Sequence, residues 1–470
     1  MLPQPSPALP ATLGELRESR PDLLVHRTVK EEVRANLVAR LSAGEPSFPR
    51  MVGLEETVIP QVERALLAGH DLVLLGERGQ GKTRLARSVI GLLDEWTPVV
   101  EGSELHEHPA APVIAATARR ISELGDALPI SWLHRSERYG EKLATPDTSV
   151  GDLIGDVDPV KVAAGRTLGD PETVHYGLVP RTNRGVFVIN ELPDLAERIQ
   201  VALFNVLEER DIQVRGYSLR LPLDLLVIAS ANPEDYTNRG RIVTPLKDRF
   251  GAEIRTHYPL TLADEVRLVD QEAELVGAVP AWLVEIIARF TRHVRTSPAV
   301  DHRSGVSARF AVAALETVAA GALRRAAVTG EQPVARVVDL PAVVASVRGK
   351  VEFDAVGAVE EGRESEVLVH LLRKAVSDTF RARLAGLDLS GLQTRCDTGD
   401  PIRTGELVPA AELLRQLGTV PGLAQLLGRL DVEAESPGLV ASAVELALEG
   451  LWLNRRLHKD DAGAVVEYGR

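Results

Sequence analysis

Residues 71–83 read DLVLLGERGQGKT, a short apolar run that leads directly into a glycine-rich loop. The last eight residues fit the pattern G-x-x-x-x-G-K-[ST], and a helical pattern begins at Lys82. In such a strand-loop-helix arrangement the glycines let backbone N–H groups point inward. The lysine reaches the outer phosphates of a nucleotide, and the hydroxyl of Thr83 can ligate Mg²⁺. The stretch therefore predicts a P-loop, and with it a parallel α/β sheet.

Every residue of this loop is a candidate nucleotide ligand: Gly76, Glu77, Arg78, Gly79, Gln80, Gly81, Lys82 and Thr83. Backbone N–H groups of such a loop surround the phosphates, and the N-terminus of the following helix adds positive potential. A chance glycine-rich turn is the alternative interpretation. The apolar strand before the loop and the helix after it argue against that alternative, so we expect a site for ATP with Mg²⁺.

A second apolar run, GVFVINELPDL at Gly185–Leu195, ends in a polar pair. Apolar residues precede Asn190 and Glu191, which places the pair at the end of a buried strand, the usual position for nucleotide chemistry in a parallel sheet. Glu191 is the candidate to orient and polarise the attacking water. The alternative is an acid at a helix N-terminus before Pro193, which the helix dipole favours.

Asn190 stands where P-loop enzymes usually carry an aspartate that helps to hold Mg²⁺. Asparagine keeps the shape and one acceptor oxygen but loses the negative charge. Because the phosphates, Thr83 and water still offer oxygen ligands, the sequence predicts weaker Mg²⁺ binding rather than none. Thr83 and Asn190 are therefore the candidate metal ligands, and Asn190→Asp is expected to raise the affinity for Mg²⁺.

The bulk composition is that of a globular protein of 470 residues with 44% hydrophobic content, enough for roughly three domains. The net charge of −13 argues against a sequence-wide electrostatic contact with nucleic acid or anionic membrane. Cys396 is the only cysteine, and the proline-rich start does not resemble a signal peptide, so we expect a cytoplasmic protein. No apolar run reaches the ~18 residues needed to cross a bilayer, so no direct membrane insertion is expected.

Strand patterns alternate with helical patterns in the first part of the chain and nearly vanish after Leu260. Such alternation implies a doubly wound parallel sheet. Residues 101–150 fit no clear pattern, apart from a helix expected near residues 113–124. The chain is expected to comprise an N-terminal helical segment with a disordered start at residues 1–46, an ATPase core at 47–260, a helical lid at 261–350 and a helical C-terminal region at 351–470.

Five segments together resemble the AAA+ ATPases: MVGLEE before a helix, the P-loop, GVFVINEL, VIASANPEDY and PLKDRFG. GDLIGDVDP followed by VHYGLVPRTNRG is similar to the helix-2 insertion of magnesium-chelatase ATPase subunits and MoxR-type proteins. DIQVRGYSLRLP resembles their hairpin before sensor 1. The resemblance covers about residues 49–310. It implies an α/β fold: a P-loop AAA+ core with a parallel sheet in αβα layers, then a helical lid and a helical C-terminal region.

The resemblance assigns roles to three further residues. Asn232 resembles sensor 1, whose amide helps to hold the water or the γ-phosphate; the alternative is a turn asparagine before Pro233. Arg249 resembles the arginine finger that reaches a neighbouring subunit's nucleotide, and its alternative is an ion pair within the chain. Arg309 resembles sensor 2, at the first turn of a lid helix. With Glu191, these residues are the candidate catalytic set.

An arginine finger implies assembly, because one subunit completes the ATP site of the next. Such a contact is heterologous, and its repetition generates a closed ring or a filament. Family analogy predicts a homo-oligomeric, hexameric ring, in which Glu191→Gln traps ATP and stabilises the assembly. The resemblance also implies a protein partner that carries a von Willebrand factor A domain.

The predicted function is an ATP-hydrolysing motor that remodels or activates a protein partner, slow or Mg²⁺-demanding because of Asn190. The alternative is an ATP-gated, ring-forming scaffold with little hydrolysis, and Asn190 is its one sequence argument. Two narrower interpretations rank below these. Metal insertion into a tetrapyrrole fits poorly with Asn190 and with residues 101–150, and enhancer-binding transcription activation lacks its GAFTGA loop.

Two weaker clusters remain. In LHEHP, His106, Glu107 and His108 could ligate a metal, but adjacent residues seldom converge on one ion, so a solvated loop is the preferred interpretation. In SWLHRSERY, the aromatic and basic side chains around Trp132 could stack on a base or a partner. Such a cluster more often packs on its own domain.

Overall fold

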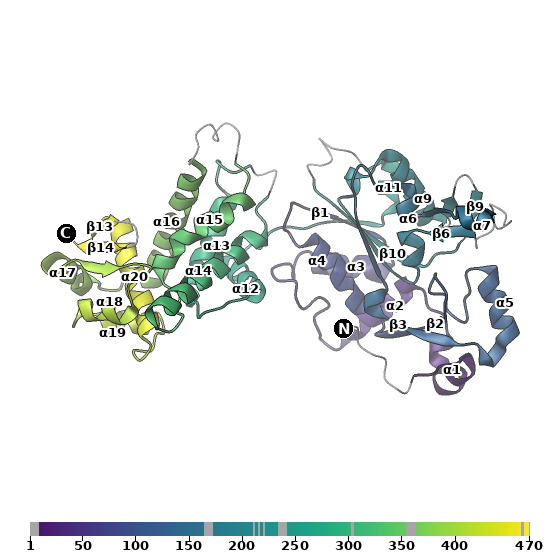
Figure 1. The fold of residues 1–470 in the computed structure, drawn as a ribbon, viewed down its shortest axis with the longest axis horizontal. Helices are drawn as coiled ribbons and strands as arrows, with labels where there is room; N and C mark the ends of the chain where they lie inside the picture. Colours follow the sequence, from purple (N-terminus) through teal and green to yellow (C-terminus); the bar gives the residue numbers. More distant parts are fainter. Residues whose placement is uncertain are drawn as a thin grey trace. The chain divides into compact units, whose positions relative to one another are not determined.

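The computed structural model describes residues 9–163, 173–209, 212–214, 217–219, 221–233, 242–301, 305–353, 363–461 and 465–469. Contacts divide the chain into two compact units (Figure 1). The first comprises residues 1–77 and 81–257, and the second comprises residues 78–80 and 258–470. The four segments expected from the sequence remain a prediction about domains.

The first unit is built on a five-stranded sheet in which every neighbouring pair is parallel. Its strands, in spatial order, are β11 (Ala252–Arg255), β1 (Leu72–Leu75), β10 (Leu225–Ala231), β7 (Gly185–Asn190) and β4 (Tyr139–Leu143). Parallel strands need crossover connections, usually helical, so the alternation read in the sequence is confirmed. The carboxyl ends of β1, β10 and β7 lie at one edge, which positions the candidate site.

Alternate residues of the central strands enter two different apolar cores, one on each face of the sheet. Val73 and Leu75 belong to one core, whereas Leu72 and Leu74 belong to the other. This period of two is what a strand buried on both faces produces. The first core is covered by α9 (Glu197–Glu209) and α11 (Thr244–Arg249), and the second by α2 (Val29–Ser42), α3 (Ile59–Ala68) and α4 (Lys82–Ser88) (Figure 1).

The remaining elements of the first unit are short. Its other helices are α1 (Leu13–Ser19), α5 (Ala115–Leu124), α6 (Val150–Leu153), α7 (Pro159–Ala163) and α8 (Leu178–Arg181). Three antiparallel pairs join β2 (Trp96–Val100) to β3 (Ile130–His134), β5 (Gly155–Val157) to β6 (Val174–Tyr176), and β8 (Ile212–Val214) to β9 (Tyr217–Leu219). The hairpin expected before β10 is thus confirmed, and the helix expected near residues 113–124 is α5.

The second unit is mainly helical, and in its helix α20 (Pro437–Leu453) the residues from Val440 to Leu451 are all buried. A helix buried on all sides is covered by other elements all round, and the two glutamates in this stretch, Glu445 and Glu449, have polar partners. The other α-helices described in this unit are α12 (Leu262–Glu272), α13 (Ala281–Arg295), α14 (Ala308–Thr329), α15 (Val343–Val347), α16 (Arg363–Leu384), α17 (Ser390–Thr398), α18 (Ala410–Leu417) and α19 (Leu423–Arg429), and of these α16, α18 and α19 pack against α20.

The sequence predicts a C-terminal region that is helical throughout, but the structure also contains strands there. An antiparallel sheet runs in the order β12 (Ile402–Thr404), β14 (Val466–Gly469) and β13 (His458–Asp461). These strands are three or four residues long, and β13 reads HKDD, so no apolar alternation marks them. Among the described helices, none is both long and apolar enough to cross a bilayer.

Candidate functional site

The P-loop follows β1 at the edge of the sheet where β10 also ends. The backbone N–H of Gly76 donates to the carbonyl of Ala231 at 3.1 Å, which joins the start of the loop to the end of β10. Gly79 and Gly81 have φ values of +78° and +79°, a left-handed conformation that side chains disfavour. Gly81 is the N-cap of α4, so the glycines of the motif let the loop turn into the helix.

Lys82 already lies inside the loop. The residue is buried, and its ammonium donates to the carbonyl oxygens of Gly76 and Glu77, the latter at 2.9 Å. A buried ammonium needs such acceptors because desolvation without hydrogen bonds is costly. Phosphate oxygens are acceptors of the same kind, so the position suits the role predicted for Lys82.

Asn190, at the end of β7, meets the P-loop threonine directly. Its Oδ1 accepts hydrogen bonds from Thr83 Oγ1 at 3.2 Å and from Ser230 Oγ at 3.0 Å. Ser230 lies in β10, between the two strands that carry the motifs. The oxygens of Thr83 and Asn190 thus share one point at the sheet edge. Oxygen donors are what Mg²⁺ prefers, so these residues fit the metal that the sequence predicts.

The amide nitrogen of Asn190 faces a carboxylate that sequence reasoning missed. Its Nδ2 donates to Glu141 Oε1 at 2.6 Å, and Glu141 lies in the neighbouring strand β4. Glu141 Oε2 also accepts from Arg87 at 2.6 Å and from the Tyr139 hydroxyl at 2.7 Å. Partial burial raises the pKa of Glu141, but Arg87 and these hydrogen bonds outweigh it and hold the pKa below its usual value.

Glu191 adopts a backbone conformation that is rare for a side chain of its kind. Its φ of +55° is left-handed, and its N–H donates to Ser230 Oγ at 3.4 Å. Such conformations carry a cost of about 1–3 kcal/mol and are found mostly at functional sites. Glu191 directly precedes the short 3₁₀ helix Leu192–Asp194. Its position therefore fits both interpretations given above, the residue that polarises the attacking water and the acid at a helix N-terminus.

The three residues carried over from the resemblance lie in different places. Asn232 is buried directly after β10, beside the strand that leads into the P-loop. Arg249, at the end of α11, forms an ion pair with Glu208 and stacks over the Phe204 ring at 4.9 Å. This is an ion pair within the chain, the alternative noted above. Arg309 lies in the first turn of α14, in the second unit.

The LHEHP segment is buried except for His106, which is half-buried, so the expectation of a solvated loop is wrong. Glu107 is fully buried and accepts from the backbone N–H groups of Val113 and Ile114 at 2.6 and 2.8 Å, just before α5. His108 Nε2 lies 3.0 Å from the carbonyl of Leu23. No group of three or more His, Cys, Asp or Glu able to hold a metal occurs in the described ranges.

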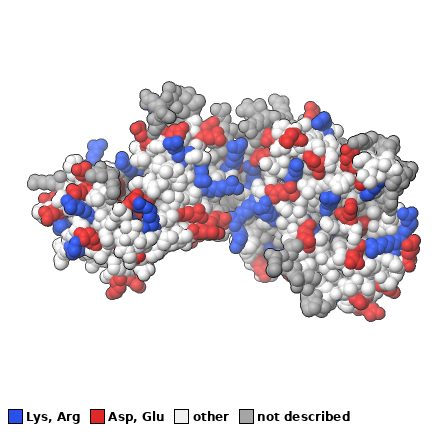
Figure 2. Space-filling view, viewed as in Figure 1, with Lys and Arg blue, Asp and Glu red and all other residues white. Residues whose placement is uncertain are grey.

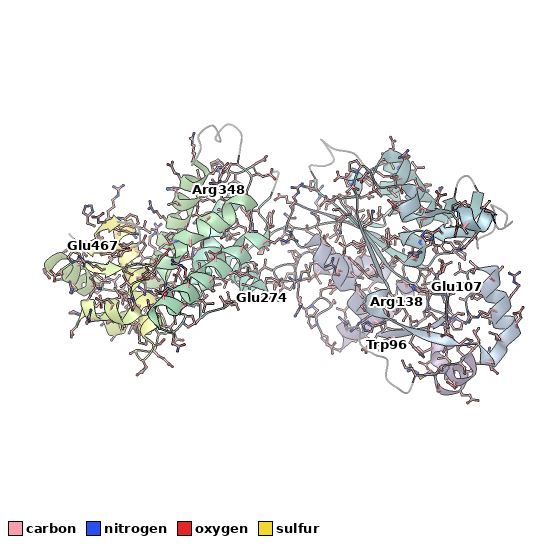
Figure 3. All side chains as sticks on the ribbon, in the orientation of Figure 1. Trp96, Glu107, Arg138, Glu274, Arg348 and Glu467 are labelled. Carbon is pink, nitrogen blue, oxygen red and sulfur yellow. The ribbon has the colours of Figure 1, made fainter. Side chains whose placement is uncertain are left out.

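The aromatic cluster near residue 132 packs on its own unit. Trp132 Nε1 donates to the carbonyl of Pro10 at 2.8 Å, and the His134 ring lies 4.9 Å from that of Trp96. Nearby, Arg138, which Figure 3 labels, is buried. Its guanidinium donates two hydrogen bonds to the Glu32 carboxylate. On the face shown in Figure 2, basic and acidic side chains are interspersed.

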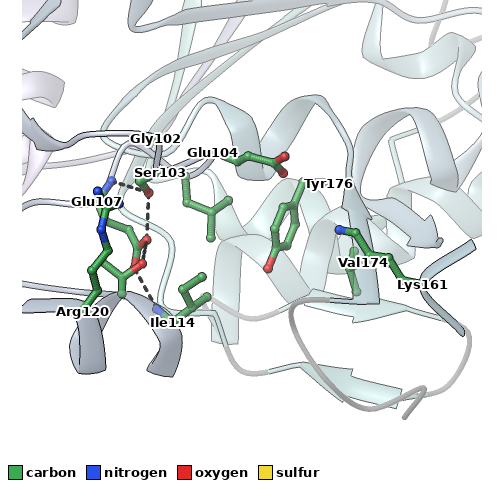
Figure 4. A pocket seen from close by; sticks show the side chains of 11 residues that line it. Gly102, Ser103, Glu104, Glu107, Ile114, Arg120, Lys161, Val174 and Tyr176 are labelled. Carbon is green, nitrogen blue, oxygen red and sulfur yellow. Dashed lines mark hydrogen bonds between the residues drawn. The ribbon is translucent and has the colours of Figure 1, made fainter. Parts of the chain in front are cut away.

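A pocket of about 310 Å³ lies away from the P-loop, between the segment around Glu107 and the β5–β6 pair. Figure 4 shows Arg120 on one side of it and Lys161 on the other, with Tyr176 between them. The Glu107 carboxylate beside it is already engaged by Ser103, Val113, Ile114 and Thr117. The Glu107 carboxylate is therefore already occupied by partners within the chain, and Glu104 is the other carboxylate that lines the pocket.

Fold and site together are similar to those of the AAA+ ATPases: a parallel sheet covered on both faces, with the P-loop and the Asn190–Glu191 pair at one edge. Residues 167–248 match the Sigma-54 interaction domain family, part of which lies outside the described residues.

More particularly, the chain is similar to magnesium-chelatase subunits, and the resemblance to that family noted in the sequence is confirmed. It is 26% identical over 247 residues to magnesium-chelatase subunit ChlI of Nostoc sp., covering 50% of this chain and 61% of that protein. It is 27% identical over 231 residues to the magnesium-chelatase 38 kDa subunit of Cereibacter sphaeroides, covering 47% and 62%. The match thus spans less than two thirds of these relatives.

Solved structures are more distant. A model of the BchI–BchD complex of magnesium chelatase is 19% identical, covers 68% of this chain and 98% of that one, and has a TM-score of 0.35. A RuvB variant from Thermotoga maritima is 13% identical, with coverage of 89% and 94% and a TM-score of 0.37. At these TM-scores the two structures carry no argument about function.

Proposed function

We propose that this chain binds ATP with Mg²⁺ at the P-loop, hydrolyses it, and uses the cycle to remodel or activate a protein partner. One observation carries the proposal: Asn190 Oδ1 lies 3.2 Å from Thr83 Oγ1, at the edge where the P-loop begins. A P-loop hydroxyl and a strand-end acceptor at one point are the protein ligands that a nucleotide-bound Mg²⁺ needs.

The residues at this edge would divide the work as follows. Loop N–H groups and Lys82 hold the phosphates, while Thr83 and Asn190 offer oxygens to the metal. Glu191 accepts a proton from the water that attacks the γ-phosphorus, the bond to the bridging oxygen breaks, and ADP and phosphate result. Asn232 helps to hold the water or the γ-phosphate. Each role depends on position, and the side chains named here come from adjacent strand ends.

Arg249 and Arg309 complete the proposal. Arg249 is 37% exposed, so it can exchange Glu208 for a nucleotide bound to a neighbouring subunit. That exchange requires a heterologous contact and hence a homo-oligomeric ring. Arg309, at the first turn of α14, would act as sensor 2. The ATP cycle of the ring would remodel or activate a partner protein that carries a von Willebrand factor A domain.

The scaffold interpretation remains the second candidate, and Asn190 favours it. An amide in place of a carboxylate removes one negative charge next to the metal, so a ring could assemble on ATP and hydrolyse it very slowly. Tetrapyrrole metal insertion and transcription activation rank below both. The magnesium-chelatase relatives and the Sigma-54 interaction domain family each match only part of this chain. In addition, the sequence lacks the GAFTGA loop of the transcription activators.

The Glu191→Gln variant tests the proposal. Glutamine keeps the size of the side chain but is a far weaker base, so ATP should stay bound in the ring. With ATP and Mg²⁺, the variant should sediment as one large assembly and retain its client during affinity purification. A variant that binds ATP as the wild type does, yet neither accumulates bound ATP nor changes its assembly, would contradict this role of Glu191.

A further inference from the structure

Asn190 differs from an aspartate in having two unlike ends. An aspartate offers oxygens in both directions, whereas an asparagine offers one oxygen and one NH₂ group. If the NH₂ group faced Thr83, it would repel a cation at that point. Something in the structure must therefore fix which end faces the metal.

Glu141 fixes it. An ionised carboxylate only accepts hydrogen bonds, so the group that faces Glu141 Oε1 at 2.6 Å must be the NH₂ group of Asn190. The oxygen is then turned toward Thr83 and Ser230, which are 3.2 and 3.0 Å away. Both hydroxyls can donate to it, so all three contacts of the amide agree on one orientation.

Glu141 is itself held in place from the P-loop helix. Arg87 donates to its Oε2 at 2.6 Å, and the Tyr139 hydroxyl does so at 2.7 Å. Arg87 and Thr83 are four residues apart on α4, hence on the same helical face. The contacts thus run from Thr83 through Asn190 and Glu141 to Arg87 and return to the helix where they began.

We propose that Glu141 is a positioning residue for Mg²⁺ at the nucleotide site. Glu141 keeps the Asn190 oxygen directed to the metal. It also places a negative charge next to Asn190, a residue that is itself uncharged where P-loop enzymes usually have an aspartate. The negative charge is therefore carried by β4, the strand next to β7. This inference rests on the proposed function, because it concerns the metal that accompanies the nucleotide.

One consequence changes the expectation for Asn190→Asp. An aspartate at residue 190 would direct one carboxylate oxygen at Glu141, and two like charges at that distance disfavour each other. The single substitution should therefore bind Mg²⁺ no better than the wild type. Asn190→Asp combined with Glu141→Gln restores a donor opposite the new carboxylate, so the double variant should bind Mg²⁺ more tightly than either single variant.

The test compares the dissociation constant of a fluorescent ADP analogue with Mg²⁺ and with EDTA. In Glu141→Gln, the Mg²⁺-dependent tightening should fall by about tenfold, as is typical when the partner of a metal ligand is removed. The affinity in EDTA should change by less than about twofold, because the loop and Lys82 hold the phosphates. Glu123→Gln, which removes an exposed acid from α5, is the matched control and should resemble the wild type.

Electron paramagnetic resonance of Mn²⁺ bound with ADP gives a second measurement that does not depend on turnover. The inference is overturned if Glu141→Gln and Glu141→Ala keep the full Mg²⁺ effect, or if the double variant gains nothing over Asn190→Asp. If the wild type binds no nucleotide, the proposed function fails together with this inference. If the wild type binds it and the Glu141 variants bind it equally well, only this inference fails.

Discussion

Two arginine–glutamate pairs in the first unit differ in how firmly the fold holds them. Arg138 and Glu32 have side chains 0% and 6% exposed, and their two hydrogen bonds of 2.7 and 2.6 Å join α2 to the turn before β4. Arg249 and Glu208 have side chains 37% and 35% exposed, and they join the ends of α11 and α9. The first pair is part of the core, whereas the second lies at the surface.

The difference separates what one chain provides by itself from what assembly must provide. A buried pair costs several kcal/mol when one partner is removed, so Arg138 and Glu32 keep β4, and Glu141 on it, in register. A half-exposed pair contributes little, about 0–1 kcal/mol, so Arg249 can leave Glu208 at small cost. The metal side of the site is therefore expected in the monomer, and the arginine finger only in a ring.

The largest effect is expected for Arg249→Ala. Removal of an arginine finger lowers turnover by about a thousandfold or more, because the charge on the transferring phosphoryl group loses its partner. Nucleotide affinity should stay within about twofold of the wild type, because the P-loop is untouched. Steady-state ATP hydrolysis and nucleotide titration measure the two quantities, with Arg198→Ala, at an exposed position of α9, as the control.

Mixed assemblies show whether the arginine acts between subunits. Lys82→Ala lacks the phosphate ligand but keeps Arg249, and Arg249→Ala lacks the finger but keeps the P-loop. A mixture of the two should recover part of the turnover that neither has alone. No recovery in rings shown to contain both variants would place Arg249 in the fold of its own subunit.

The next effect concerns stability. Glu32→Gln leaves Arg138 buried without its charge partner, so the free energy of unfolding should fall by about 3 kcal/mol. Urea unfolding followed by intrinsic fluorescence measures the change, and Glu18→Gln, an exposed residue of α1, serves as the control. A loss as small as that of the control would mean that the buried pair does not hold β4.

A smaller effect depends on pH. Burial, with Arg184 nearby, lowers the pKa of His108 to about 3 from an ordinary value of 6.5. Between about pH 6.5 and about pH 3, His108 is protonated in the unfolded chain but not in the folded chain. The free energy of unfolding therefore falls as the pH falls through this window. Between pH 7 and pH 4.5, the free energy of unfolding of His108→Gln should fall by about 2.5 kcal/mol less than that of the wild type, as measured by urea unfolding. Parallel losses in both proteins would contradict the buried, neutral histidine.

The smallest effect is expected for Glu208→Gln. It removes the surface partner of Arg249 and should change the free energy of unfolding by less than about 1 kcal/mol. Turnover of the assembled protein should not fall, because Arg249 must leave Glu208 in order to act. A fall comparable to that of Arg249→Ala would assign Glu208 to the site itself.

The parts of this site that depend on local sequence patterns could be predicted from the sequence. The P-loop is a contiguous motif, and the apolar runs before Asn190 and Asn232 predict buried strands that end there. β4 was missed because Tyr139–Leu143 reads YGEKL, a strand at the end of the sheet order with polar residues in its middle. Without β4, the contact between Glu141 and Asn190 could not be predicted, since the pairing of strands distant in sequence is set by tertiary packing.

The buried LHEHP segment shows the same limit. Charged and imidazole side chains favour the surface on average, so a solvated loop was the reasonable expectation. Glu107 is buried because it accepts the N–H groups of Val113 and Ile114, just before α5, and no spacing in the sequence marks that contact. Partners of this kind become visible only when the chain is folded.

ATP turnover by the purified wild-type protein across a series of Mg²⁺ concentrations, with Lys82→Ala as the inactive control, tests most directly whether this chain is an ATPase. We expect hydrolysis that rises with Mg²⁺ and then reaches a plateau, because Asn190 offers the metal an oxygen but no charge. Tight ATP binding with no turnover above the control at any Mg²⁺ concentration, in assembled rings with the partner present, would contradict it and leave the scaffold function.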